Sequence, residues 1–156
     1  MNITIKDFMS LALEEAQKAE ERGEVPIGAV IADPEKKNVV ASAGNRTREK
    51  NDPTAHAEML AIRIATTKIG SERLTSHHLF VTLEPCSMCA SAISFARIQH
   101  LYIGAYDFKS GGVLHGARIF DHPTCHHRPE ITSGHRENEC NNLLKLFFAK
   151  RRLVKI

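Results

Sequence analysis

Three residues in the middle of the chain have the types and spacing of zinc ligands. His56 supplies an imidazole, and Cys86 and Cys89 supply two thiols three positions apart. A structural zinc is normally closed by four protein ligands, whereas a catalytic zinc keeps one position open for water. Glu58 follows the histidine by two positions and offers a carboxylate that can carry protons. These residues predict a hydrolytic Zn²⁺ centre on His56, Cys86 and Cys89, with Glu58 as the catalytic proton carrier.

Each half of this pattern is ambiguous by itself. A His-x-Glu sequence is also typical of polar residues at a helix start, and Cys-x-x-Cys also occurs in redox pairs and buried pairs of small residues. The full order H-x-E…P-C-x-x-C, with Pro85 directly before the first cysteine, is the signature of zinc-dependent nucleobase deaminases. The inverse assignment, with Glu58 as ligand and His56 as base, suits zinc less well beside two thiolates, so we favour His56 as the ligand.

Periodicity and turn residues predict the elements that position these side chains. Apolar residues with helical spacing predict a first helix over 7–22, which Gly23 ends. Two apolar segments joined by a turn at Asp33-Pro34 predict two adjacent strands. The full expectation is strands over 27–32, 39–43, 78–84, 100–106 and 130–132, helices over 55–68, 85–97 and 137–150, and an irregular stretch over 107–129.

This order of elements predicts an α/β fold with a central mixed five-stranded sheet and helices on both faces, in three layers. Both candidate metal-binding segments fall at helix starts, where the positive end of the helix dipole favours thiolates. Cys86 and Cys89 are three apart and share one helix face. His56 and Glu58 are two apart and point in different directions on an ideal helix, so their cooperation needs a distorted first turn or a substrate between them.

Length and composition limit the remaining possibilities. The 156 residues suffice for one domain with a core, so we expect a single deaminase domain over 1–156. Hydrophobic and charged contents of 42% and 25% are typical of a globular protein. No secretory signal or stretch of transmembrane length is present, so we expect no membrane association. The four cysteines form no evident disulfide framework, which predicts a cytoplasmic location.

The charge is concentrated near the carboxyl terminus. Although the net charge is only +3, residues 146–155 combine two phenylalanines with four cations. Cations of this kind neutralise phosphates, and a neighbouring aromatic ring stacks on a base. The alternative is a solvated helix end whose phenylalanines belong to the core, and this segment alone favours that alternative.

Taken together, these and further motifs resemble the bacterial tRNA-specific adenosine deaminases over essentially the whole chain. The matching segments are VPIGAV (25–30), GNR (44–46), NDPTAHAEM (51–59), VTLEPCSMCA (81–90), GAYDFKSG (104–111), HRPEI (127–131) and the terminal pairs Glu139-Cys140, Leu143-Leu144, Phe147-Phe148 and Arg151-Arg152. The first half of this set is shared with guanine and cytosine deaminases, and the later segments separate the tRNA branch.

The resemblance implies a cytidine-deaminase-like fold, a homodimer and one Zn²⁺ per subunit. It also implies hydrolytic conversion of the wobble adenosine to inosine in a tRNA anticodon stem-loop, expected to be an arginine tRNA with the anticodon ACG. In that reaction the zinc activates a hydroxide and Glu58 shuttles the proton. Because a tRNA loop presents unpaired bases, flipping one out costs less than in a duplex, and we expect no DNA partner.

Substrate-binding roles follow from the same resemblance. Asn45 would hydrogen-bond the flipped adenine, and the backbone N–H of Ala57 would donate to the oxygen at the zinc or to the base edge. Asp107 and Lys109 would lie beside the anticodon loop, and Phe148 and Arg151 would line the RNA groove. Each residue has an alternative role: Asn45 follows Gly44 and could cap a turn, Asp107 could cap the segment after its strand, and Lys109 could be a surface cation.

The chain departs from the common family pattern on both sides of Asp107. Tyr106 stands where many relatives have arginine or leucine, and Phe108 stands where proline or alanine is usual. These aromatic residues put the fine anticodon preference in doubt, although an aromatic there could stack on RNA. The histidines and cysteine of 122–127 could suggest a second metal site, but a loop of this length needs polar residues in any case, and we expect none.

Two rival functions remain from the sequence. The first is a free-base deaminase, chiefly a guanine deaminase, for which the basic-aromatic terminal helix and the Asp107–Ser110 segment would have no use. The second is a non-catalytic RNA-binding module with a structural zinc, for which Glu58 and the missing fourth protein ligand would have no use. Both comparisons favour the tRNA deaminase.

Overall fold

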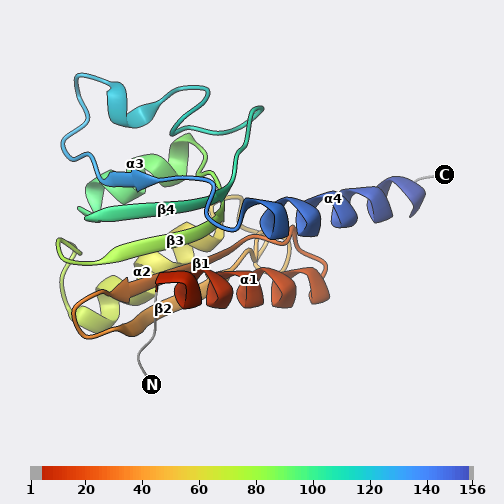
Figure 1. Ribbon diagram of the computed structural model, residues 1–156, viewed down its shortest axis with the longest axis horizontal. Helices are drawn as coiled ribbons and strands as arrows, with labels where there is room; N and C mark the ends of the chain where they lie inside the picture. The colour runs from red at the N-terminus through yellow and green to blue at the C-terminus, as the bar shows by residue number, and fades with distance from the viewer. Residues whose placement is uncertain (1–4, 155–156) are drawn as a thin grey trace.

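The computed structural model describes residues 5–154, in which five strands form one mixed sheet between two pairs of helices (Figure 1). The strands are β1 (Gly28–Asp33), β2 (Asn38–Gly44), β3 (His78–Leu83), β4 (His100–Ala105) and β5 (Glu130–Thr132). The helices are α1 (Ile5–Glu21), α2 (Ala57–Ile69), α3 (Ser87–Phe95), α4 (Glu137–Val154) and the short 3₁₀ helix η1 (Ile119–Asp121). The expected α/β architecture with a mixed five-stranded sheet is confirmed.

The sheet topology brings several strand ends to one edge. The strand order is β2-β1-β3-β4-β5. β1 pairs antiparallel with both β2 and β3, whereas β3, β4 and β5 pair in parallel. The carboxyl ends of β2, β3 and β4 therefore lie along the same edge. The segments that leave these strands begin at Asn45, Glu84 and Tyr106, so residues far apart in the sequence meet there.

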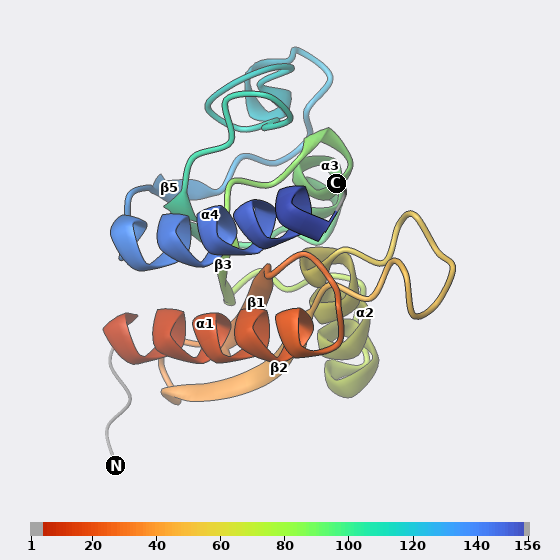
Figure 2. The ribbon, with the colours of Figure 1, turned by 90° about the vertical axis from the view of Figure 1, so that its right-hand side faces the viewer.

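Helices cover both faces of the sheet, which gives three layers (Figure 2). α1 and α4 lie side by side on one face, and α2 and α3 lie on the other. The larger core packs α2 and α3 against side chains such as Ile31, Leu79 and Ile103, all fully buried. A second cluster packs α1 against the opposite face around Phe80. The alternating apolar residues of the strands explain this two-sided core.

The expected helix boundaries are wrong by two residues or more at five ends. α1 begins at Ile5 rather than at 7, and α3 ends at Phe95 rather than at 97. α2 begins at Ala57 rather than at 55, and α3 begins at Ser87 rather than at Pro85. The preceding residues His56 and Cys86 are N-caps with extended backbone, which turns their side chains toward each other. α4 continues to Val154 rather than ending at 150, because the cations Arg151 and Arg152 in its last turn suit the negative end of a helix.

Candidate active site

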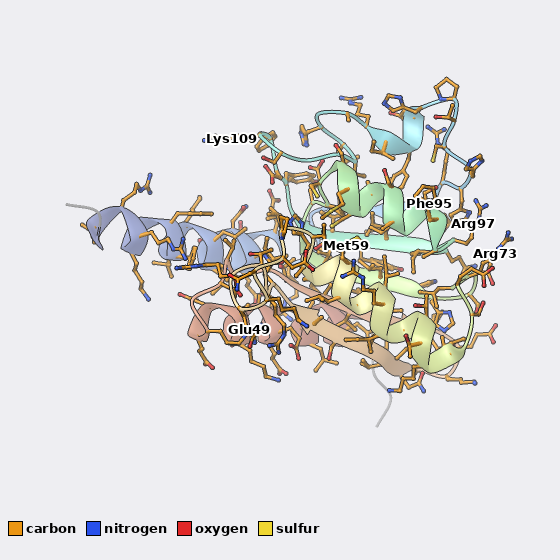
Figure 3. All side chains as sticks on the ribbon, turned by 180° about the vertical axis from the view of Figure 1, so that it is seen from behind. Glu49, Met59, Arg73, Phe95, Arg97 and Lys109 are labelled. Carbon is orange, nitrogen blue, oxygen red and sulfur yellow. The ribbon has the colours of Figure 1, made fainter. Side chains whose placement is uncertain are left out.

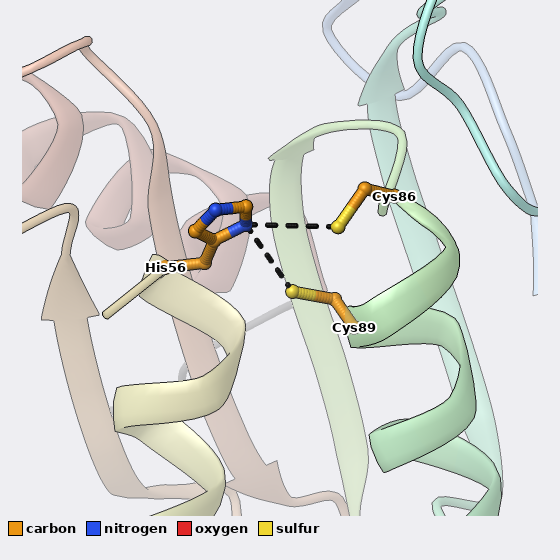
Figure 4. Close-up of side chains that lie close together, drawn as sticks. All are labelled: His56, Cys86 and Cys89. Carbon is orange, nitrogen blue, oxygen red and sulfur yellow. Dashed lines mark hydrogen bonds between the residues drawn. The ribbon is translucent and has the colours of Figure 1, made fainter. Parts of the chain in front are cut away.

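The predicted zinc ligands converge at the sheet edge, where α2 and α3 begin (Figure 4). The Nδ1 atom of His56 lies 3.6 Å from the Sγ of Cys86 and 3.6 Å from the Sγ of Cys89. Neither N-cap side chain caps its own helix, so both remain directed at the site. Among residues 5–154, this is the one group of at least three histidine, cysteine, aspartate or glutamate side chains whose ligand atoms converge.

The geometry of this group fits zinc. In a tetrahedral site with Zn–S of about 2.3 Å and Zn–N of about 2.0 Å, a nitrogen ligand and a sulfur ligand lie about 3.5–3.6 Å apart. The two distances from His56 match this spacing. The ligand set of one imidazole and two thiols is also one that zinc prefers over harder metals. The chain supplies three ligands, which leaves one coordination position for a non-protein group.

The charges in the site favour ligation by the first cysteine. A hydrogen bond from the Cys89 thiol, with a further contribution from the His56 imidazole, lowers the pKa of Cys86 to about 4 against the opposing effect of burial. The same hydrogen bond and burial raise the pKa of Cys89. A divalent cation at this point would stabilise both thiolates.

Glu58 lies in the first turn of α2, beside the ligands and nearly sealed from solvent at 4% exposure. Burial raises the pKa of its carboxyl group, while the neighbouring His56 acts in the opposite direction. Because His56 is extended and outside the helix, the two side chains face the same site although they are two positions apart. A buried carboxyl with a raised pKa beside a metal site is suited to accept and return protons.

Asn45 is held rigidly at the same edge. Its side-chain Oδ1 accepts a hydrogen bond from the backbone N–H of Ala57 at 2.9 Å, and the side chain is buried. The Arg22 guanidinium donates to the Asn45 backbone carbonyl at 3.1 Å. With Oδ1 occupied, the Asn45 NH₂ group is the part that can donate to a base. The Ala57 N–H serves Asn45 in this structure, and its predicted contact with substrate stays a prediction.

A groove of about 800 Å³ lies between α4 and the segment that follows β4, at the end of the sheet where β3 and β4 finish, and its lining includes neither the three candidate ligands nor Glu58. Its lining includes all four residues predicted to contact RNA, namely Asp107, Lys109, Phe148 and Arg151. It also includes residues that the sequence reasoning did not single out: Val25, Leu83, Ser110, Asn141, Leu144, Lys145 and Arg152, together with the two aromatic departures Tyr106 and Phe108. The structure therefore places the terminal helix and the distant 106–110 segment on one surface.

Local contacts fix the lining of this groove. The Asp107 carboxylate accepts hydrogen bonds from the backbone N–H groups of Lys109 and Ser110, so its alternative role as a cap is confirmed. Arg151 donates to the Gly23 carbonyl at 3.0 Å, and its guanidinium lies 4.7 Å from the centre of the Phe147 ring. These contacts hold a cation and a turn at fixed places on the two sides of the groove.

Glu84 is a buried charged residue near the candidate ligands that the sequence reasoning did not single out. Its side chain is fully buried, and its Oε1 pairs with Nδ1 of His115 at 2.7 Å. Its two oxygens also accept backbone N–H groups from the segment after β4, at Asp107, Val113, Leu114 and His115. Burial alone would raise the pKa of Glu84, but these bonds outweigh it and lower the pKa. One signal in the sequence could have pointed to this residue: it is a charged side chain at the end of an apolar strand, directly before Pro85.

Within the described part of the chain, no residue of 122–127 belongs to a converging group of metal-ligating side chains. In the same part of the chain, no helix is long and apolar enough to cross a membrane.

Comparison with known proteins places this geometry in a family. Residues 3–105 match the family described as the cytidine and deoxycytidylate deaminase zinc-binding region. A tRNA-specific adenosine deaminase from Agrobacterium fabrum is 56% identical over 94% of this chain and 95% of its own length. A relative with the same name from Haemophilus influenzae is 44% identical over 93% of this chain and 83% of its own length.

Solved structures agree with the sequence matches. A structure from studies of A-to-I editing by tRNA deaminases at the wobble position superposes with a TM-score of 0.85 and 57% identity, covering 88% of this chain and 98% of that one. A guanine deaminase from Nitrosomonas europaea has a TM-score of 0.80 at 19% identity over 94% of this chain and 86% of its own, which shows a shared fold alone. The chain thus belongs to the zinc-binding cytidine and deoxycytidylate deaminase family, and within it to the tRNA-specific adenosine deaminases.

Proposed function

We propose that the protein hydrolyses the wobble adenosine of a tRNA anticodon stem-loop to inosine, with an arginine tRNA carrying ACG as its main substrate. The observation that carries this proposal is the position of the three-ligand site, which shares a sheet edge with a groove lined by cations and aromatics. A free base would leave this groove without a ligand. The two bacterial relatives match nearly the whole chain and are named tRNA-specific adenosine deaminases, which supports the same substrate.

The chemistry of the site follows from its residues. Zinc bound by His56, Cys86 and Cys89 would supply a water that is activated at neutral pH. Glu58 accepts a proton from the attacking water and delivers it to a ring nitrogen of adenine. It then takes the second proton from the hydroxyl group formed on the reacting carbon and delivers it to the departing amino group. Carbon C6 thereby exchanges nitrogen for oxygen, and ammonia leaves. The donating NH₂ of Asn45 holds an acceptor atom of the base during these transfers.

The groove would hold the anticodon loop around the flipped base. Lys109 and Arg151 stand on opposite sides of it and would neutralise backbone phosphates, while Phe148, 47% exposed, offers a ring face to a neighbouring base. Asp107 keeps the 107–110 turn in place through its backbone contacts. These assignments predict that affinity for tRNA falls with salt concentration.

We also propose one zinc per subunit, a homodimer formed by a single domain over 1–156, and a cytoplasmic location. All four cysteines are free, as a reducing compartment would require. Metal analysis of the purified protein should give one zinc per chain, and Cys89→Ser should fall well below that value while an exposed control, Ser110→Ala, keeps it. Equal zinc in both variants would contradict the ligand assignment.

The decisive experiment uses zinc-loaded protein and a transcript of arginine tRNA with the anticodon ACG. Sequencing after incubation should reveal inosine at the wobble position and at no other adenosine. Free guanine, cytidine and adenosine, followed by ammonia release, should remain unchanged, as should a DNA stem-loop of the same sequence. Ammonia from a free base together with unmodified tRNA would overturn the proposal in favour of a metabolic deaminase.

A further inference from the structure

One aromatic side chain on the groove has no structural role of its own. Phe108 is 76% exposed although it lies on a turn that a hydrogen bond fixes. The backbone N–H of Ser110, two residues further on, donates to the Asp107 carboxylate. It lines the same groove as Phe148 and Arg151 from the opposite side. A single exposed apolar residue is common, but Phe108 shares this groove with Phe148, which is 47% exposed, and exposed apolar side chains gathered in a groove indicate a ligand.

The Phe108 ring is held at a fixed angle by its neighbours. The edge of the His115 ring meets it at 4.6 Å between centroids with an interplanar angle of 67°. Tyr106 lies 6.3 Å away and is also edge-on to His115. These contacts cover one side of the Phe108 ring and leave the rest in the groove. A ring that is already oriented loses little conformational entropy when it binds.

His115 is fixed in turn by the buried Glu84. The 2.7 Å contact between His115 Nδ1 and Glu84 Oε1 sets the plane of the imidazole, and the backbone N–H of His115 donates to Glu84 Oε2. A Cβ atom at Gly111 would lie 2.3 Å from Glu84 Oε2, so only glycine allows the segment to close on this carboxylate. A series of contacts thus links Glu84 to His115 and His115 to Phe108. It leads from a position beside a candidate zinc ligand to the surface of the groove.

The charges around Phe108 identify the class of its ligand. Lys109, Lys145, Arg151 and Arg152 line the groove together with one carboxylate, that of Asp107. Cations surrounding exposed rings fit a polyanion with flat apolar groups, which is the chemistry of single-stranded nucleic acid. An apolar protein surface would have to desolvate these cations. Lys109, the neighbour of Phe108, lies on the opposite side of the molecule from the exposed Phe95 (Figure 3).

We propose that Phe108 stacks on one unpaired base of the anticodon loop, and that His115 and Glu84 are positioning residues that hold its ring for this contact. This inference rests on the proposed function and assigns to this chain a specificity contact at a position where its aromatic residue is unusual. The stacked base is a neighbour of the reacting adenosine, so the contact sets which loops are accepted and not the rate of the chemical step.

Steady-state kinetics with the stem-loop substrate test the contact. Phe108→Ala should raise KM by about 5- to 100-fold, the range for loss of one stacked base, and leave kcat within about threefold. Phe108→Tyr keeps the ring and should stay near the wild type, whereas Phe108→Leu keeps only apolar bulk and should fall between. Leu146→Ala, which removes an exposed apolar side chain of α4 outside the groove, should change neither constant.

A double-mutant cycle tests the positioning role of His115. His115→Ala alone should raise KM severalfold without changing kcat, because the Phe108 ring loses its support. Adding His115→Ala to Phe108→Ala should cause little further change, since the function of His115 passes through the ring. Glu84→Gln should show the same KM effect with its thermal stability measured alongside. Fully additive KM effects, or a loss confined to kcat, would overturn the positioning role.

Fluorescence identifies the stacked base directly. A stem-loop with 2-aminopurine placed at each loop position in turn would be bound to zinc-loaded Glu58→Ala protein, which does not turn over. One position should be quenched on binding, and that quenching should disappear with Phe108→Ala and persist with Phe108→Tyr.

The possible outcomes separate the two proposals. If wild-type protein makes wobble inosine but Phe108→Ala leaves KM and quenching unchanged, the stacking inference is wrong and the proposed function stands. If wild-type protein neither binds nor modifies the stem-loop, both are wrong. If Phe108→Ala changes the sedimentation mass from dimer to monomer, the ring covers a second copy of the chain and the stacking inference is overturned.

Discussion

The spacing of His56 and Glu58 illustrates how a local backbone change decides the use of a side chain. On a continuous helix these residues would point in different directions. In the structure His56 is the N-cap of α2 with φ −73° and ψ 153°, and the helix begins only after it. The imidazole therefore faces the thiols of α3, while Glu58 enters the same site from the first helical turn. No substrate is needed to bring the two residues together.

At this scale, Glu58→Gln should separate metal binding from proton transfer. The amide keeps the size of the carboxyl group but cannot accept and return a proton, so kcat should fall by about 10²–10⁴-fold or more. Zinc content should stay at the wild-type value because Glu58 is not a ligand. The measurement is single-turnover inosine formation with metal analysis of the same sample, and Glu72→Gln, at an exposed position in the turn after α2, is the control. A near-normal rate would show that another group shuttles the proton.

Among the elements, the segment after β4 depends on close backbone approach to α3. Gly112 donates its N–H to the Pro85 carbonyl at 2.8 Å. A Cβ atom at this position would lie 2.5 Å from the backbone nitrogen of Ser87 and 2.8 Å from the backbone carbonyl carbon of Cys86. The turn that carries a zinc ligand and the segment that lines the groove are thus packed against each other without room for a side chain.

Gly112→Ala should therefore disturb both the turn that carries a candidate zinc ligand and the segment that lines the groove. Because the clash is with backbone, the segment must shift, which should lower the free energy of unfolding by about 1–3 kcal/mol and weaken tRNA binding. Thermal unfolding and KM should both be measured, with Ala117→Ser as an exposed control in the same segment outside the groove. Unchanged stability would mean that the segment is more loosely packed than the structure shows.

The starts of β3 and β4 carry a histidine pair that should make stability depend on pH. His78 and His100 lie 5.4 Å apart between ring centroids, and burial lowers the pKa of both. In the unfolded chain their pKa values are about 6.5, so that state binds protons first as the pH falls. Stability contributed by the neutral pair is therefore complete above about pH 6.5 and is lost as the pH falls toward the folded pKa values.

The melting temperature should accordingly fall between about pH 7.5 and 5.5, and His78→Gln should reduce that fall. Glutamine can still donate to Gln99, whose side chain now contacts His78 at 3.2 Å. His126→Gln, at an exposed position, controls for general charge effects. An identical pH dependence in wild type and His78→Gln would exclude the histidine pair as its source.

At the scale of the whole molecule, the face formed by α2 and α3 carries exposed apolar side chains, and we propose it as the interface of the proposed homodimer. Phe95 is 69% exposed, and Ile64 and Ile69 are 45% and 41% exposed on the neighbouring helix. Figure 3 shows Phe95 on this outer face of α3. Exposed apolar side chains on two helices of one face are typical of a homodimer interface.

If this face forms the proposed homodimer, Phe95→Glu should convert it to a monomer at micromolar concentration. A carboxylate placed at the centre of the contact would be buried without a partner. Sedimentation velocity gives the mass, and Leu153→Glu, at a position that is 72% exposed on α4, is the matched control. A dimer that survives Phe95→Glu and dissociates with Leu153→Glu would move the interface to the other face.

The sequence by itself predicted the candidate ligand set and determined the order of the elements and the mixed sheet. His56, Cys86 and Cys89 are recognisable because zinc restricts its ligands to few residue types, and the apolar periods of the strands and helices are local properties of the chain. The helix starts were missed by two residues because an N-cap differs from a helical residue only in its backbone angles. That distinction depends on what the side chain contacts.

Only the tertiary structure decided which distant residues meet at the sheet edge. Glu84 and His115 are 31 positions apart, and Asn45 and Ala57 are joined by a hydrogen bond across a long turn. The parallel pairing of β3 with β4 brings the segments after both strands together, and no local pattern encodes that pairing. The groove therefore depends on long-range strand register, whereas the hydrolytic chemistry was predicted from three candidate ligands and a glutamate in the sequence.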